Sequence, residues 1–544
     1  MHGEAPPVAE AVLRRPAPDL RDRLLSGSLW ILISQVVIQA MSVAVTVVLA
    51  RYLGRTETES AELLGTYLLY STIFTVLATV ATLGIFVGLP RIIAELQATR
   101  SPRLAAATSN GLTLGLIASA LVGIGAFLGA DLVSLAYPRH PELILLLRVS
   151  TPAVVFSVLS VTALSVLQGL QRIREYSLVA MAFSVLSVPV TWLLVIQHRV
   201  FLLENALTGA AVAATVNIVL NALGVVWVVR RQTRLEGLPL RLRVDRAESR
   251  ALLSLSMPAL GSALVLRPAL LYQTSIIFLV LKEATTGVWK ITSAFYRVIL
   301  FVPAALAIPL LPAMSQLYVT APTRERREKV TKVLRITFVL VLPLCLIAGL
   351  GAQYLIGFLF GPTYVNNDSV YATFLLTAAA FFDAGTVVVI SLLQGTGRTR
   401  QAFALDGLQA AIIVVLTFLL IRDELKLRGA AAATLGNSVV ILAVSLGYLA
   451  RRQEVDLRSI GDMIGLGVAA FGVAGIVILL GLATWAFIPL AAATVAVTFL
   501  VGWRLLWRSD REILRHAFRL VLPRGKGAPT PSAETFPRGG SGGT

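Results

Sequence analysis

The sequence predicts an all-α integral membrane protein of about fourteen transmembrane helices, arranged as two six-helix lobes and a C-terminal helix pair. Three observations predict this fold class. Of the 544 residues, 56% are hydrophobic and only 14% are charged, which is roughly half the charged share of a soluble domain. Apolar stretches of about 20 residues, each long enough to cross a hydrocarbon core of about 30 Å, follow one another along the chain. Finally, elements of the first half return in the second half.

Each expected helix is an apolar stretch bounded by charged or turn-forming residues. The expected spans are residues 28–50, 64–88, 108–130, 143–167, 176–197 and 206–229, then 252–280, 286–311, 333–360, 370–393, 402–421 and 429–450, and finally 460–483 and 485–507. Prolines such as Pro258 and Pro343 fall inside spans, where neighbouring helices can satisfy the carbonyls that a kink frees.

An internal repeat relates the two halves. Residues 167–174 read LQGLQRIR and residues 393–400 read LQGTGRTR. Nearly the same spacing pairs Gly65 with Gly287 and Gly129 with Gly351. Matches that drift over only a few residues indicate a duplication, and a duplicated membrane chain builds two packed halves with a site between them.

Basic residues predict the topology, because Lys and Arg in short loops resist translocation. With the N-terminus inside, cytoplasmic segments carry roughly four times as many as outer segments. Both termini are therefore expected in the cytoplasm of a multi-pass plasma (inner) membrane protein. The formal charge of +18 then reflects topology and contact with anionic membrane lipids, and no nucleic-acid partner is expected.

The expected organisation has six parts. They are a disordered cytoplasmic tail (1–27), an N-lobe (28–231), a basic cytoplasmic linker (232–250), a C-lobe (251–452), the last two helices (453–508) and a basic, then disordered, cytoplasmic tail (509–544).

Enzymatic chemistry is not expected. The four histidines lie at no metal-ligand spacing, and the chain has no Walker A loop. The expected outer loops are too short to hold a catalytic domain for lipid-linked sugars. No cofactor or metal is therefore predicted.

Ionisable residues inside spans are the main candidates for a binding site, because a charge in the bilayer is costly. Four lie in the second half: Arg267, Lys290, Arg297 and Asp383. Tyr272 and Gln273 follow Arg267 on its helix. Three cations with one carboxylate predict a positive central cavity suited to phosphate or carboxylate, which guanidinium binds with two hydrogen bonds.

Structural alternatives stand beside this prediction. Lys290 is close enough to the outer surface to snorkel. Arg297 and Asp383 could form a fixed interhelical bridge, and Asp383 could instead couple transport to Na⁺ or H⁺. Arg267 fits a structural role least well.

Neutral polar residues form a second candidate set. Gln35 and Gln39 belong to a polar stripe along the first helix, and Asn217 and Asn221 lie one turn apart on the sixth. Such residues either hold helices together or line a wet cavity that suits sugar hydroxyls.

Several motifs resemble a known family. The segments ARYLG (50–54), LGTY (64–67), LG (83–84) and LPRIIAE (89–95), with the two LQGxxR segments, are similar to polysaccharide transporters of the multidrug/oligosaccharidyl-lipid/polysaccharide exporter (MOP) superfamily. The resemblance implies a fold like that of multidrug and toxin extrusion (MATE) transporters, with two lobes facing a cavity open to one side at a time. It also implies a flippase that moves a glycan on a polyprenyl diphosphate to the outer leaflet, with polysaccharide-assembly proteins as partners.

Two other branches of this superfamily are alternatives. Lipid II flippases also have fourteen helices, but the resemblance leads one to expect arginines in their first two helices, and this chain has none there. Drug exporters typically carry a carboxylate in the first or seventh helix, and this chain has none there either.

The repeated LQGxxRxR element falls in two expected cytoplasmic loops. Its arginines either fix orientation or form a cytoplasmic mouth that attracts the diphosphate. These residues are Arg172, Arg174, Arg398 and Arg400.

Overall fold

The computed structural model describes residues 20–99, 101–235, 237, 244–306, 322–422, 424–480 and 484–506. The expected tails (1–27 and 509–544) lie wholly or largely outside these residues, as do the middle of the 232–250 linker and the end of the 286–311 span. All regular elements of the described part are helical.

The first half contains nine helices in the described residues. They are α2 (Leu20–Tyr52), α3 (Glu57–Ala81), α4 (Ile85–Ala98), α5 (Leu104–Leu128), α6 (Leu132–Ala136), α7 (Glu142–Val149), α8 (Thr151–Gly169), α9 (Ile173–Ile196) and α10 (Ala206–Leu235).

The rest of the described chain is equally helical. Its elements are α11 (Arg246–Ile299), α13 (Thr323–Leu350), α14 (Ala352–Leu359), the 3₁₀ helix η1 (Pro362–Tyr364), α15 (Asn367–Gly395), α16 (Thr399–Leu420), α17 (Lys426–Arg451), α18 (Leu457–Leu479) and α19 (Thr484–Leu505).

Thirteen helices of the described part are long and apolar enough to cross a membrane, which makes the protein multi-pass. One of them, residues 246–306, contains two of the expected spans. It is interrupted at Lys282, whose φ of 70° and ψ of 173° are not helical. The contacts of α11 show that the chain reverses there. Ser256 of the first segment lies beside Gly84, which follows α3, and Gly287 lies beside Ala61 near the start of α3. Lys290 then lies over Tyr67, further along α3, so the second segment runs back in the opposite direction. Whether α11 is counted once or twice decides between thirteen and fourteen.

Three expected spans are each divided into two helices. The 64–88 span is broken between α3 and α4, where Gly84 adopts a left-handed φ of 68° that glycine tolerates. The 143–167 span is broken at Ser150 and the 333–360 span at Gly351. Hydropathy does not mark such breaks, because the flanking residues are apolar on both sides.

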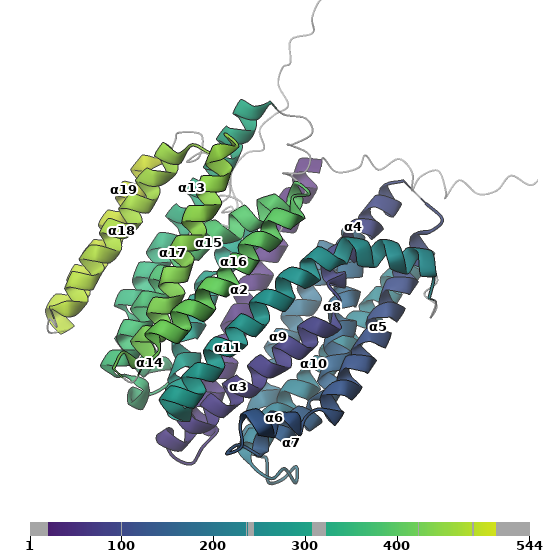
Figure 1. Ribbon diagram of the computed structural model, residues 1–544, viewed down its shortest axis with the longest axis horizontal. Coiled ribbons are helices and arrows are strands. Elements are labelled where there is room, and N and C mark those ends of the chain that lie inside the picture. The colour runs from purple at the N-terminus through teal and green to yellow at the C-terminus, as the bar shows by residue number, and fades with distance from the viewer. Residues whose placement is uncertain are drawn as a thin grey trace, which may run out of the picture.

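The helices form two groups joined by α11 (Figure 1). In the first group α2 packs on α9, and α10 packs on α8 and α9; in the second α15 packs on α13 and α17. Helix α11 packs most extensively on α3 and also contacts α15 and α16. Helices α18 and α19 pack on each other and on α13 at the outer edge of the second group (Figure 1).

The bundle has two distinct ends. Figure 1 shows α6, α7 and α14 at one end, which we call the loop end, and the start of α2 at the other, which we call the tail end. An apolar cluster at the loop end joins both groups. It contains Leu49, Leu53 and Leu64 from the first half and Ile356, Phe360 and Tyr364 from the second.

Two glycines that the repeat relates touch each other's helices at this end. A Cβ on Gly65 would lie 1.9 Å from the Glu283 carbonyl oxygen, and a Cβ on Gly287 would lie 2.0 Å from the Ala61 carbonyl oxygen. The two contacts are reciprocal, since Ala61 and Glu283 stand at the same places before Gly65 and Gly287. The pseudo-twofold axis of the duplication therefore passes between α3 and the second segment of α11.

A buried arginine fixes the C-terminal helix pair to the second group. Arg335 of α13 is 2% exposed and donates to Ser459 Oγ at 3.1 Å and to the Leu505 carbonyl oxygen. One side chain thus contacts both α18 and α19. About two turns further along α18, Gly467 leaves space for the ring of Phe381 on α15.

We expect Gly65→Ala and Gly287→Ala each to destabilise the protein, because the added methyl group must push α3 and α11 apart. Overpacking of this kind costs about 1–3 kcal/mol, measured here as a lower temperature of thermal unfolding in detergent. Gly461→Ala on α18, where no atom lies within 4 Å of the new methyl group, is the matched control. Equal stability in all three variants would contradict the close crossing.

Candidate functional site

The second segment of α11 places two cations beside the first group of helices. Lys290 is 8% exposed, and its Nζ lies 5.0 Å from the centre of the Tyr67 ring on α3, within range of a cation–π interaction. Arg297 is two turns further along the same face and is exposed. Its guanidinium donates to Ser293 Oγ at 3.3 Å. Lys290 is thus enclosed rather than directed to a surface.

Asp383 lies in the middle of α15 and is 4% exposed. Its Oδ2 accepts hydrogen bonds from Tyr296 at 2.5 Å and from Ser438 at 2.8 Å. Its Oδ1 is buried and has no hydrogen-bond partner among the described residues. Within the described residues no ion pair joins Asp383 to Arg297, so the alternative of a fixed bridge between them is not formed, and Asp383 instead contacts Tyr296, the neighbour of Arg297 in the sequence.

Arg267 lies on the first segment of α11 and is exposed. No hydrogen bond or ion pair in the described part of the chain joins it to Lys290 or Arg297. Gln273, further along this segment, contacts a different helix. It is buried, and its Nε2 lies 3.2 Å from Thr434 Oγ1 of α17. Gln273 therefore packs two helices of the second half together, while Tyr272 is half-buried.

The other predicted polar residues lie within the first group. Asn217 of α10 donates to the Ser187 carbonyl oxygen of α9 at 3.4 Å. Asn221 Oδ1 is buried and has no hydrogen-bond partner in the part of the chain that the structure describes. Gln35 and Gln39 on α2 are half-buried. The structure brings Lys290, Tyr296, Arg297 and Asp383 close in space, and shows no contact of these with the asparagines or glutamines in the described residues.

The arginines of the repeated LQGxxRxR element have different surroundings. Arg398 makes a two-bond ion pair with Glu454 at 2.9 and 2.8 Å, and Glu454 is 5% exposed. Arg174 lies 5.6 Å from the centre of the Trp30 ring. Arg400 is exposed and Arg172 half-buried. Arg398 therefore ties the loop after α15 to the segment after α17.

Two features escaped the sequence analysis. Asp406 is a second carboxylate inside a span, on α16, and is only 6% exposed. Ser71, Thr75 and Thr79 follow one another every four residues on α3 and are half-buried, each donating to its own helix. A search for charges and for hydroxyls at helical spacing would have found both.

Burial on α3 changes along its length. Towards the loop end Leu64, Leu69 and Tyr70 are buried, whereas residues 71–80 are all half-buried. The first and second groups are therefore in close contact at the loop end, and the surface of α3 that continues from Tyr67 is partly open towards the tail end.

Cross-lobe hydrogen bonds hold the loop end together. Arg51 at the end of α2 donates to the carbonyl oxygens of Leu359 at 2.9 Å and Phe358 at 2.7 Å. Tyr364 donates to the Ala50 carbonyl oxygen at 2.9 Å. On the opposite side of the pseudo-twofold axis, the hydroxyls of Tyr137 and Ser275 lie 2.6 Å apart.

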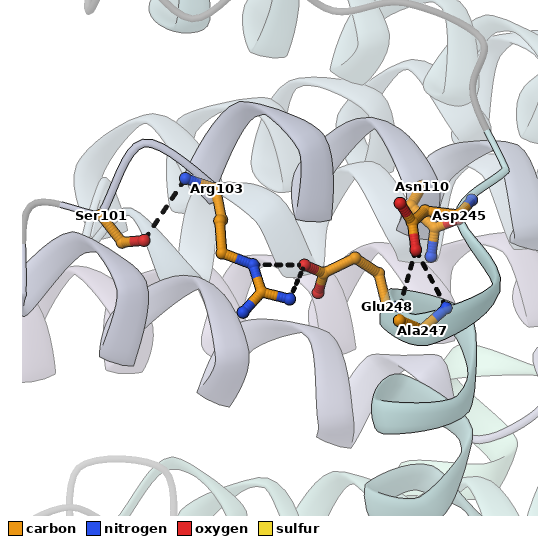
Figure 2. Close-up of polar contacts among 6 residues, drawn as sticks. All are labelled: Ser101, Arg103, Asn110, Asp245, Ala247 and Glu248. Carbon is orange, nitrogen blue, oxygen red and sulfur yellow. Dashed lines mark hydrogen bonds and ion pairs between the residues drawn. The ribbon is translucent and has the colours of Figure 1, made fainter.

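At the tail end, the start of α11 is attached to α5 (Figure 2). Asp245 caps α11 by accepting from the backbone N–H groups of Ala247 and Glu248. Glu248 forms an ion pair with Arg103 at 2.6 Å. Asn110 Oδ1 accepts from the Asp245 N–H at 2.8 Å. The first segment of α11 thus begins on the first group and packs along the second.

No set of His, Cys, Asp and Glu side chains in the described residues has the geometry of a metal site. The arrangement offers instead cationic groups for an anion, a buried carboxylate, and two lobes joined at one end. Such a geometry suits binding and conformational change.

Solved structures share this fold. An inward-facing MATE family multidrug resistance transporter of the MOP superfamily covers 79% of this chain and 98% of its own, with 17% identity and a TM-score of 0.62. An outward-facing structure of such a transporter gives 16% identity, 81% and 99% coverage and a TM-score of 0.59. A MOP superfamily transporter from Pyrococcus furiosus, described as having a binding pocket of reverse polarity, shares 14% identity with this chain and gives a TM-score of 0.59. It covers 81% of this chain and 99% of its own.

The sequence comparison identifies the family. No curated protein sequence matches the chain. The family model described as polysaccharide biosynthesis protein matches residues 48–368, which is more than half of the chain. The chain therefore belongs to the polysaccharide biosynthesis protein family, and it shares the fold of the membrane transporters of the MOP superfamily.

Proposed function

We propose that this transporter is a flippase that moves a polyprenyl-diphosphate-linked oligosaccharide from the cytoplasmic to the outer leaflet of the plasma membrane. The observation that carries the proposal is the pair Lys290 and Arg297, two cations within the spans on the helix segment that packs against the other lobe. A cation within the bilayer is costly, so its presence in a span indicates a functional site. A diphosphate supplies the charge and the acceptor geometry that such a pair binds.

Alternating access follows from the difference between the two ends. The loop end is closed by the apolar cluster and the cross-lobe hydrogen bonds, while α3 is half-exposed towards the tail end. With both termini in the cytoplasm, the tail end is cytoplasmic and this conformation is inward-facing. The diphosphate then reaches Arg267 and Arg297 from the cytoplasm, and the lobes rock to expose it to the outer side.

Sugars need neutral hydrogen-bonding groups rather than charges. We assign this role to Gln35 and Gln39 on α2 and to the Ser71, Thr75 and Thr79 face of α3, which are all half-buried. The polyprenyl tail stays in lipid. Polysaccharide-assembly enzymes on the outer side are the partners that would consume the product.

Drug export is a competing proposal, because several structural neighbours are multidrug transporters. Identities of 14–17% extend only the fold to this chain. The cations described above repel an organic cation, by about 4 kcal/mol for two charges 4 Å apart near a protein surface.

We expect Arg297→Ala and Arg267→Ala each to lower flipping of a fluorescent lipid-linked oligosaccharide in proteoliposomes by about ten- to hundredfold. A hydrogen bond to a charged group contributes about 1.5–3 kcal/mol, and each 1.4 kcal/mol is about tenfold. The Lys variants should retain part of the activity, since they keep the charge but lose the two-bond geometry.

Arg148→Ala is the control, because Arg148 pairs with Asp131 on the surface. Full activity of both alanine variants at normal expression would refute the arginine assignment. Transport of a cationic dye in place of the glycan would favour drug export.

We also propose that Asp383 couples transport to an ion, H⁺ or Na⁺. A buried carboxylate oxygen without a partner costs about 1–3 kcal/mol, and either ion removes that cost by binding Oδ1. The hydrogen bond from Tyr296 joins this carboxylate to the residue that precedes Arg297 in the chain. The effect of cation binding at Asp383 can therefore reach Arg297, the residue proposed to hold the cargo, through Tyr296.

We expect Asp383→Asn to abolish the response of the flipping rate to an imposed proton or sodium gradient while cargo binding persists. Tyr296→Phe should weaken the response, because it removes one of the two bonds to Oδ2. The measurement compares rates in vesicles with and without each gradient. A response that persists in Asp383→Asn and disappears in Asp406→Asn would move the coupling site to α16.

A further inference from the structure

A histidine at the loop end lies between two carboxylates from different parts of the fold. His140 stands between α6 and α7 in the first half. Its Nδ1 lies 2.9 Å from Glu142 Oε1, and its Nε2 lies 3.1 Å from Glu283 Oε1. Glu283 belongs to the second half and follows the reversal at Lys282. The imidazole therefore spans the boundary between the two lobes.

Both contacts form together only when the cluster holds an extra proton. A neutral imidazole has one N–H and one acceptor nitrogen, and an ionised carboxylate only accepts. In the fully deprotonated cluster one of the two contacts would join acceptor to acceptor. One added proton, on the imidazole or on a carboxylate, turns that contact into a hydrogen bond.

The surroundings make this contact part of the lobe boundary rather than an isolated surface pair. The His140 side chain is 16% exposed, and its ring centre lies 4.7 Å from that of Phe278. Gly65 of α3 packs against the backbone carbonyl oxygen of Glu283. Side chain and backbone of Glu283 thus both contact the first lobe, and separating the lobes here breaks both contacts.

Other charged groups near the cluster are few in the described residues. Arg139 and Lys282, the sequence neighbours of His140 and Glu283, are exposed, and Glu62 on α3 is exposed as well. Arg148 at the end of α7 is already paired with Asp131. The two carboxylates in contact with the ring are therefore its immediate charged neighbours among the described residues.

We propose that His140, Glu142 and Glu283 form a proton-binding latch that closes the loop end. The proposal rests on the alternating access of the proposed function, in which this end faces outside. The closed state binds one proton more than the open state, so a lower pH at the loop end favours closure and a higher pH favours opening. Outer acidity thereby returns the unloaded carrier to its inward-facing state.

The test measures lobe separation without cargo. Spin labels are placed at Val200→Cys and Leu425→Cys, two exposed loop-end positions in the first and second half (73% and 43% exposed), while the native Cys345 is buried. Pulsed electron paramagnetic resonance then gives the closed-to-open ratio in proteoliposomes. We expect this ratio to rise as the pH falls from about 8 to 6, by at most about tenfold per pH unit for one proton.

Three variants separate the latch from other causes. His140→Gln should remove the pH response, because glutamine takes up no proton. Glu283→Gln should stay closed across the range, because its amide donates to a neutral imidazole while Nδ1–H still donates to Glu142. His198→Gln is the matched control, since the one hydrogen bond of the His198 ring within the described residues is to the Val195 carbonyl oxygen of its own segment.

A wild-type ratio that does not change with pH, or a response that survives in His140→Gln, overturns the proposal. These outcomes do not depend on the cargo, because none is present. Failure to flip a lipid-linked oligosaccharide refutes the proposed function and leaves the spin-label result to be judged by itself.

Discussion

The close crossing of α3 and α11 at Gly65 and Gly287 is the constraint on which the rest of the structure depends. Lipid offers no hydrophobic force to press two membrane helices together, so small residues that let backbones approach are needed. Here each glycine faces a carbonyl oxygen of the other helix. Lys290 follows Gly287 by one turn and Tyr67 follows Gly65 by two residues, so the crossing also brings the Lys290 amine to the Tyr67 ring.

The duplication gives the two lobes the same arrangement of helices, and the charged candidate residues lie at positions where the two copies differ. At the offset that pairs Gly65 with Gly287, Lys290 corresponds to Leu68, Arg297 to Thr75 and Arg267 to Val45. Leu68 is buried in an apolar cluster with Leu281 and Trp289. One lobe therefore keeps an apolar or hydroxyl surface where the other carries cations. An asymmetric cargo with a charged diphosphate and neutral sugars matches such a division.

The sequence was sufficient for the fold class because hydropathy, charge and the repeat all act over long segments. The repeat in the sequence paired Gly65 with Gly287. Two residues that a repeat relates need not touch, because their contact depends on where the pseudo-twofold axis of the duplication runs. The contact of Gln273 with α17 could not be predicted for a related reason. A helix that is apolar all round gives no amphipathic contrast, so the sequence does not show which side faces α17. Tyr296 and Asp383 are 87 residues apart, and only the packing of α11 on α15 joins them. Asp406, in contrast, was visible as a charge inside a span.

The contacts at the loop end determine how much free energy cargo binding must supply to separate the two lobes. Four cross-lobe hydrogen bonds, two from Arg51, one from Tyr364 and one between Tyr137 and Ser275, must break when this end opens. At a net 0.5–1.5 kcal/mol each they contribute about 2–6 kcal/mol, before the apolar cluster is considered. A ligand shifts such an equilibrium only by its difference in affinity for the two states. Under the proposed function, cationic groups that held the diphosphate equally well in both states would leave the loop end closed. We therefore propose that Lys290, buried near the crossing, gains access to the cargo only as the lobes separate. In this proposal the exposed Arg297 and the buried Lys290 act at two successive stages of one path, on the two sides of the change that the glycine crossing must permit.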